Sequence, residues 1–165
     1  MLTKVLKKTF SKKHLNIKSF SNKNVQNDNV VKSIDEIIDI WRNTGIKLNA
    51  PATIDVLKKV QENINFQFPD DFINFYLRIN GFKDWDMTNE MFSIWTLERI
   101  EEEVLKSDNT NFIPFCDYLI NSYRYGFHKD KLGIYKEYYS DMTYKMTDTF
   151  EEIIKLIYLD SSSLH

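Results

Sequence analysis

Between residues 33 and 65 the hydrophobic positions recur at the spacing of amphipathic α-helices. A first helix is predicted to begin at Ser33, which has capping-box spacing to Glu36, and to end near Gly45. A second helix is predicted to begin near Thr53. Their inward-facing positions are Ile34, Ile37, Ile38 and Trp41 in the first helix and Val56, Leu57, Val60 and Ile64 in the second. Two amphipathic helices therefore open the folded domain.

The most strongly specified helix follows. Pro69 is predicted at its first helical position, where a missing N–H has no partner to lose, and Asp70 and Asp71 complement the positive end of the helix dipole. Asn80-Gly81 is predicted to end it, because glycine adopts the left-handed C′ conformation without steric cost. Its apolar residues are Phe72, Ile73, Phe75, Tyr76, Leu77 and Ile79. So broad an apolar surface predicts a nearly buried core helix.

Beyond Gly81 the period of the pattern changes. Met91–Trp95 alternates and predicts a strand, whereas Leu97, Ile100 and Val104 predict a short helix. From residue 112 onward, aromatic and β-branched residues separated by turn signals predict an antiparallel meander. Its candidate strands are 112–119, 123–128, 132–138 and 142–146.

A closing helix is predicted from a second capping box, formed by Thr149 and Glu152. The predicted fold class is therefore α+β, with N-terminal helices, an antiparallel sheet of about five strands and a closing C-terminal helix. The predicted organisation is a basic leader over residues 1–32, one domain over residues 33–160 and a tail over residues 161–165.

Composition narrows the class of protein. The 15% aromatic content favours a globular core over disorder, and the single Cys116 excludes an internal disulfide and fits a reducing compartment. No apolar run approaches the roughly 20 residues of a membrane helix, and the N-terminus lacks the apolar core of a secretory signal. We therefore expect a cytoplasmic protein.

The net charge of -2 conceals an asymmetry. Residues 1–25 hold seven lysines and no acidic residue, whereas the remaining 140 residues hold 15 basic and 24 acidic side chains, a balance of -9. The lysine-rich segment is interpreted as a solvated leader, with contact to a membrane, a nucleic acid or the acidic body as alternatives. The acidic body would repel phosphates, so nucleic acid is not an expected partner, and membrane contact is not favoured.

No catalytic or metal-binding motif is present in the sequence. His14, His128 and His165 lie too far apart for a ligand motif, and the isolated glycines exclude a P-loop. Cys116 and His128 could meet across neighbouring strands as nucleophile and base, but a lone cysteine in an apolar strand is usually a small core residue. We expect no enzyme activity, cofactor, metal or small-molecule substrate.

An acidic segment follows the third helix. Trp85 stands between Asp84 and Asp86 in a predicted loop, and tryptophan anchors interfaces while acids steer basic partners. The alternative is that Trp85 packs back onto the core. The next predicted helix adds a solvated acidic face. The predicted partner surface consists of Asp84, Trp85, Asp86, Glu98, Glu101, Glu102 and Glu103.

A set of motif residues recurs in order between residues 50 and 160: Glu62, Pro69, Asn80, Gly81, Trp95, Pro114 and Phe115. Their order and spacing resemble the SUKH superfamily, the Smi/Knr-like domain of bacterial immunity proteins and fungal cell-wall regulators. Two features depart from the family pattern. Phe68 replaces the usual leucine, and Cys116–Ile120 stands where a glycine-rich loop is common.

The resemblance implies a non-enzymatic binding domain. In bacteria such domains act mostly as immunity proteins that bind and block a cognate toxin, often a nuclease or deaminase. An acidic body fits a basic nuclease, because opposite charge steers the encounter. The expected partner is therefore a cognate protein toxin, whose active surface would be covered. The alternative, implied by the fungal relatives, is an intracellular regulatory scaffold without a toxin partner.

Overall fold

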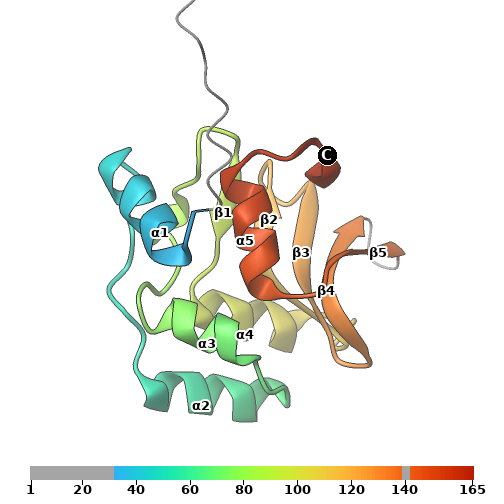
Figure 1. The fold of residues 1–165 in the computed structure, drawn as a ribbon. Coiled ribbons are helices and arrows are strands. Elements are labelled where there is room, and N and C mark those ends of the chain that lie inside the picture. Colours follow the sequence, from blue (N-terminus) through green and yellow to red (C-terminus); the bar gives the residue numbers. More distant parts are fainter. Residues whose placement is uncertain (1–31, 139–141) are drawn as a thin grey trace, which may run out of the picture. The chain divides into compact units, whose positions relative to one another are not determined.

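The computed structural model describes residues 32–138 and 142–165 (Figure 1). The predicted leader lies outside the described residues, apart from Lys32. The helices are α1 (Ile34–Asn43), α2 (Ile54–Ile64), α3 (Asp70–Tyr76), α4 (Leu97–Lys106) and α5 (Phe150–Tyr158), with short 3₁₀ turns at Lys83–Trp85 and Ser162–Leu164. The strands are β1 (Phe92–Ile94), β2 (Phe112–Tyr118), β3 (Tyr123–His128), β4 (Lys131–Tyr138) and β5 (Met142–Thr147).

The strands form one antiparallel sheet in the order β1-β2-β3-β4-β5. The predicted α+β class and the five-stranded sheet are confirmed. Helix α5 lies across one face of the sheet (Figure 1). On that face Tyr125 Oη and Lys136 Nζ both donate to the carbonyl of Leu164. Side chains alternate along a strand, so the neighbouring Arg124 and Glu137 lie on the opposite face.

Three predicted helix starts, at Ser33, Thr53 and Thr149, are confirmed by their caps. The hydroxyls of Ser33 and Thr149 accept from the N–H groups of Glu36 and Glu152, and both capping boxes are complete. Thr53 caps α2 through its hydroxyl. These bonds satisfy donors that the first helical turn leaves without partners.

The third helix is shorter than predicted. Pro69 is the N-cap of α3 instead of its first helical residue, and the helix ends at Tyr76, well before Asn80-Gly81. Gly81 is nevertheless required, because its φ is +65° and an added Cβ would lie 2.3 Å from the carbonyl oxygen of Trp95. The glycine therefore permits close approach to the end of β1 and does not end the helix.

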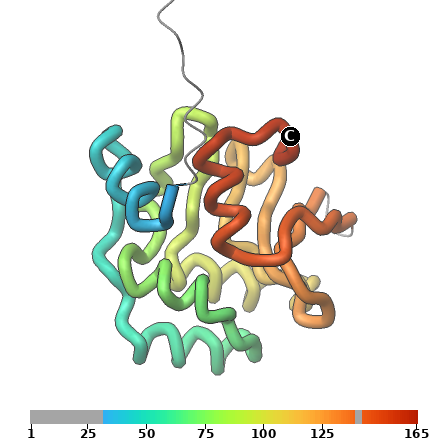
Figure 2. The backbone as a smooth tube through the Cα atoms, viewed as in Figure 1, coloured from blue at the N-terminus to red at the C-terminus, as the bar shows by residue number. Residues whose placement is uncertain are grey.

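Aromatic rings dominate the core between the α5 face of the sheet and the helices. Phe72 of α3 contacts both Phe115 of β2 and Phe150 of α5 edge to face. Trp41 brings α1 into the same core through Phe75. After α5 the chain turns back toward the strands (Figure 2). Leu164 is buried and its carbonyl accepts from Tyr125 Oη, so this residue of the segment 161–165, set apart in the sequence as a tail, belongs to the core.

Candidate protein-binding site

A hollow of about 400 Å³ lies where the 3₁₀ turn, the end of β1 and helix α4 meet. Carboxylates and two tryptophans surround it. Its lining residues are Phe82, Asp84, Trp85, Ser93, Ile94, Trp95, Thr96, Glu98, Arg99 and Glu102. We call it the Trp85 hollow. It combines an aromatic surface with acidic groups, the chemistry that the sequence predicted for a partner surface.

Arg99 organises this hollow from inside. Its Cζ lies 3.8 Å from the ring centroid of Trp95 and 3.9 Å from that of Trp85. Its Nη2 lies 3.1 Å from Oδ2 of Asp117, whose side chain is only 4% exposed. The indole N–H of Trp95 donates to the same carboxylate. Burial lowers the pKa of Arg99, and Asp117 opposes that shift, which favours a charged guanidinium.

Trp85 lies at the surface. It is 65% exposed, although Arg99 stacks on its ring. Its φ is +61° and that of Asp84 is +55°, in the left-handed region that bulky side chains rarely adopt. Such strain persists only where surrounding contacts impose it, and it is common at functional sites. Because most of the Trp85 side chain is exposed, the alternative in which Trp85 packs into the core is wrong.

The structure brings together four of the seven predicted partner residues, Asp84, Trp85, Glu98 and Glu102. The other three have different surroundings. The carboxylate of Asp86 accepts from the backbone N–H groups of Lys47 and Met87, so it holds the loop in place. Glu101 accepts from the side chain of Asn63, and Glu103 lines a separate hollow. Arg99 was missed in the sequence, although it is the one basic residue within the acidic run of α4.

The family-motif residues belong mainly to the scaffold. Asn80 accepts from the Leu97 N–H at 2.9 Å and donates to Glu98 at 3.0 Å, so it fixes the start of α4 beside the hollow. Trp95, Pro114 and Phe115 are buried, and Glu62 lies exposed on α2. Pro69 is the N-cap of α3, as described above. Of these positions, Asn80 and Trp95 support the Trp85 hollow directly.

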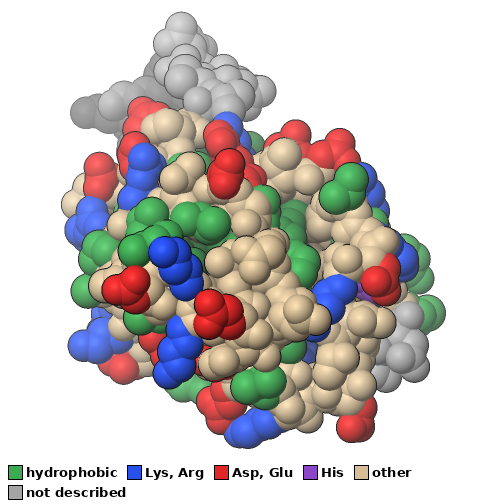
Figure 3. Space-filling model, turned by 90° about the horizontal axis from the view of Figure 1, so that it is seen from below, with side chains coloured by type: hydrophobic (Ala, Val, Ile, Leu, Met, Phe, Trp, Pro, Cys, Tyr) green, Lys and Arg blue, Asp and Glu red, His purple; other side chains and the backbone are tan. Residues whose placement is uncertain are grey.

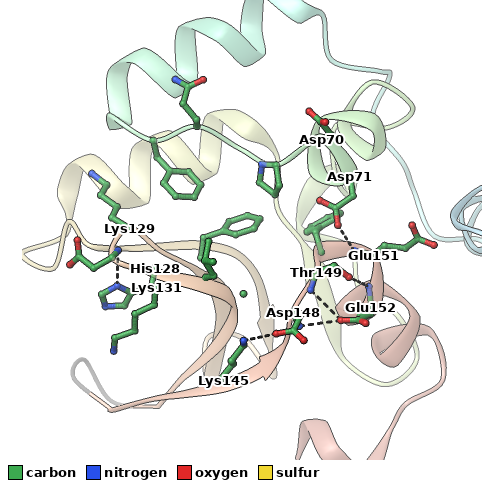
Figure 4. Close-up of a pocket in the computed structure, with 18 of the residues that line it drawn as sticks. Asp70, Asp71, His128, Lys129, Lys131, Lys145, Asp148, Thr149, Glu151 and Glu152 are labelled. Atoms are coloured by element: carbon green, nitrogen blue, oxygen red, sulfur yellow. Dashed lines mark hydrogen bonds and ion pairs between the residues drawn. The ribbon is translucent and has the colours of Figure 1, made fainter.

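A larger hollow, of about 1140 Å³, lies elsewhere, between the start of α3, the β3–β4 hairpin and the start of α5 (Figure 4). Several of its charged groups already have partners within the chain. Lys145 pairs with Asp148, Lys155 pairs with Glu151, and Asp71 accepts from the Glu151 N–H at 3.0 Å. These charges therefore hold the start of α5 beside β5 and α3, and we do not assign a ligand to this groove.

Acidic and basic side chains are interspersed on the face of the molecule shown in Figure 3. No single-sign patch covers that face. The excess negative charge of the body is therefore not concentrated on that face.

The described residues offer little to catalysis. Cys116 lies opposite Tyr125 in the sheet and His128 lies opposite Phe112, so the considered cysteine–histidine pair is wrong. Burial raises the pKa of the Cys116 thiol, which keeps it protonated. Over 32–138 and 142–165, no three His, Cys, Asp or Glu side chains are grouped to hold a metal ion. In the same part of the chain, no helix has the length and apolar character needed to span a membrane.

The sequence was also compared with known protein families. A model of the SMI1 / KNR4 family (SUKH-1) matches residues 51–156, more than half of the chain. The match includes α2, α3, the Trp85 hollow, the sheet and most of α5. A search among curated proteins found no match. Helix α1 precedes the matched region but packs into the same core through Trp41.

Proposed function

The chain belongs to the SMI1 / KNR4 family (SUKH-1), and on that premise we propose that it is an immunity protein that binds a cognate bacterial toxin. Binding would neutralise the toxin by covering its active surface, without chemistry on the immunity side. A nuclease or deaminase with a basic cleft is the class of toxin that an acidic cover fits best.

The observation that carries the proposal is the exposed Trp85, stacked on Arg99 beside Asp84, Glu98 and Glu102. A tryptophan fixed before binding loses little side-chain entropy when a partner covers it. Tryptophan is also enriched among the few interface residues that dominate binding energy. The surrounding carboxylates would attract a basic surface and orient it over the ring.

Co-expression with the product of the neighbouring gene, as the candidate toxin, tests the proposal directly. Cells should survive, and the two proteins should co-purify. Trp85→Ala should weaken the complex by about 2 kcal/mol or more, the loss typical of a central anchor. Tyr144→Ala is the matched control, because Tyr144 is another exposed aromatic residue, on β5, outside the hollow. If Trp85→Ala and Tyr144→Ala bound the toxin with equal affinity, Trp85 would not be part of the interface.

Charge reversal tests the role of the carboxylates. Asp84→Lys with Glu102→Lys avoids Asp86, whose carboxylate supports the loop. This pair should slow association, with an effect that shrinks at high salt. Asp108→Lys with Asp130→Lys changes the net charge equally at exposed positions outside the hollow. If both pairs slowed association equally, overall charge and not this surface would steer the encounter.

A further inference from the structure

A second hollow, of about 570 Å³, lies beside α4 over the sheet face opposite α5. The Trp85 hollow shares none of its residues. Polar side chains and the turn between β2 and β3 surround it. Its lining residues are Glu103, Asn121, Ser122, Tyr123, Arg124, Glu137 and Tyr138. We call it the Glu137 hollow.

Glu137 carries an unpaired oxygen in this hollow. Its side chain is 2% exposed, and its Oε2 accepts from Nε of Arg124 at 2.7 Å and pairs with Nη2 of the same guanidinium. No group among the described residues donates to the buried Oε1. A buried carboxylate oxygen without a donor carries a large desolvation penalty, so native structures nearly always supply one. Over residues 32–138 and 142–165 this oxygen therefore lacks a donor that a group entering the hollow would supply.

Charge defines the kind of donor. The lining of the hollow holds the carboxylates of Glu103 and Glu137 and the guanidinium of Arg124, and Arg99 and Lys106 interact electrostatically with Glu103. An ammonium or guanidinium group that entered the hollow would be attracted to Glu137 and would supply it with an N–H donor. A second carboxylate ligand or a phosphate would add to the repulsion.

The rim indicates where that cation comes from. The turn before Asn121 exposes Leu119 and Ile120, and Ile120 is 75% exposed. Both have positive φ, which a β-branched residue such as Ile120 rarely adopts. An exposed aliphatic rim beside a charged hollow fits a protein surface better than a free amine, because only the protein would also cover the rim.

We propose that the Glu137 hollow receives one lysine or arginine side chain from a protein partner, with Glu137 Oε1 accepting its hydrogen bond. Glu103 would contribute the second carboxylate at the mouth. The assignment rests on the proposed function only for the identity of that partner. It adds a second contact, in a hollow that shares no lining residue with the Trp85 hollow, and specifies its chemistry.

The hollow can be probed without the partner. The amide resonances of the folded chain would be followed during titration with Nα-acetyl-lysine methylamide and Nα-acetyl-arginine methylamide, with Nα-acetyl-glutamine methylamide as the neutral control. The cationic probes should shift the amides of residues 121–124 and 137 with millimolar affinity, and the neutral probe should not. Equal shifts with all three probes, or none at these amides, would overturn the proposal.

Two variants localise the binding. Glu137→Gln should weaken the cationic probes about tenfold, because it removes the charge on the acceptor. Glu103→Gln leaves the pair with Arg124 intact and should weaken them about threefold. If Glu137→Gln fails to fold, the Glu103→Gln variant tests whether the cationic probes bind in the Glu137 hollow. Glu62→Gln, exposed on α2, is the control and should bind as the unaltered chain does.

A third variant separates a protein partner from a free amine. Ile120→Ser should weaken the toxin complex several-fold but leave probe binding unchanged. An unaltered toxin complex would overturn the assignment to a protein partner. If the chain neutralised the toxin but did not bind the probes, the role assigned to the Glu137 hollow would be wrong and the proposed function would stand. Probe binding by a chain that does not neutralise would instead contradict the proposed function.

Discussion

The guanidinium of Arg99 lies between two indole rings, 3.8 Å from the centroid of buried Trp95 and 3.9 Å from that of exposed Trp85. One side chain therefore links the core to the surface. Asp117 fixes the guanidinium from below, and cation–π attraction positions Trp85 above it. The candidate interface thus depends on a buried ion pair that lies beneath Trp85.

Replacing Arg99 should affect both stability and the candidate interface. Arg99→Ala leaves Asp117 buried without its ionic partner, so the free energy of unfolding should fall by about 3–5 kcal/mol in urea titrations. Arg99→Lys keeps the charge but loses the planar stack, and should cost less. Arg42→Ala is the control, because Arg42 forms an exposed pair with Asp39 and its loss should cost at most about 1 kcal/mol. Similar losses for Arg99→Ala and Arg42→Ala would show that the buried pair contributes little.

Two glycines with positive φ allow the close approach at Gly81 to be measured. Gly45 has a φ of +96° and nothing within 4 Å of an added Cβ, so Gly45→Ala reports the cost of the backbone conformation alone, about 1 kcal/mol. Gly81→Ala adds a collision with the carbonyl of Trp95 and should cost a further 1–3 kcal/mol, roughly the penalty of overpacking. Thermal and urea unfolding of both variants give the comparison. Equal losses would mean that β1 can shift to admit the methyl group.

Gly81 also shows what the local pattern can and cannot predict. The Asn80-Gly81 pair was predicted to end the third helix, and the glycine is indeed in the left-handed region. The carbonyl of Trp95, which lies close to Gly81 in the fold, is fourteen positions away in the sequence, and no local pattern predicts that contact. The caps at Ser33, Thr53 and Thr149 were predictable because each depends on a residue only three positions away.

The residues of the candidate interface also fall into two groups, those that the local sequence predicts and those that only the fold brings together. Asp84 and Trp85 were predictable as an exposed acidic and aromatic pair. Asp86 looked equivalent in the sequence, yet it accepts from Lys47, which lies 39 positions earlier. Arg99 and Asp117 become partners only when α4 packs on β2. Charge patterns thus predict acidic regions, whereas the fold decides which acids line the Trp85 hollow, where Glu98 accepts from Asn80 and Glu102 pairs with Lys106.

Cys116 should report on unfolding through its reactivity. Burial raises the pKa of its thiol, and the reactive thiolate is therefore scarce in the native chain. Alkylation with iodoacetamide at mildly alkaline pH should be slow in buffer and should follow the unfolded fraction as urea is added. Mass spectrometry of the modified peptide measures it. Fast alkylation under native conditions would contradict a closed core around β2.

The capping box of α1 should make stability depend on pH. The carboxylate of Glu36 accepts from the backbone N–H of Ser33, and these bonds lower its pKa below the ordinary value of 4.5. A carboxyl group whose pKa is lower in the folded state stabilises the fold above its ordinary pKa, and this contribution is lost as the pH falls through the folded value. Glu36→Gln keeps an acceptor at the same position but does not titrate. The stability difference between the unaltered chain and Glu36→Gln should therefore shrink between about pH 6 and about pH 3, as measured by urea titration at each pH.

Glu62→Gln, which removes one exposed charge outside any cap, corrects for the change in net charge. If, after that correction, the Glu36→Gln difference were constant across this range, the hydrogen bonds to Ser33 would not contribute to the stability of α1.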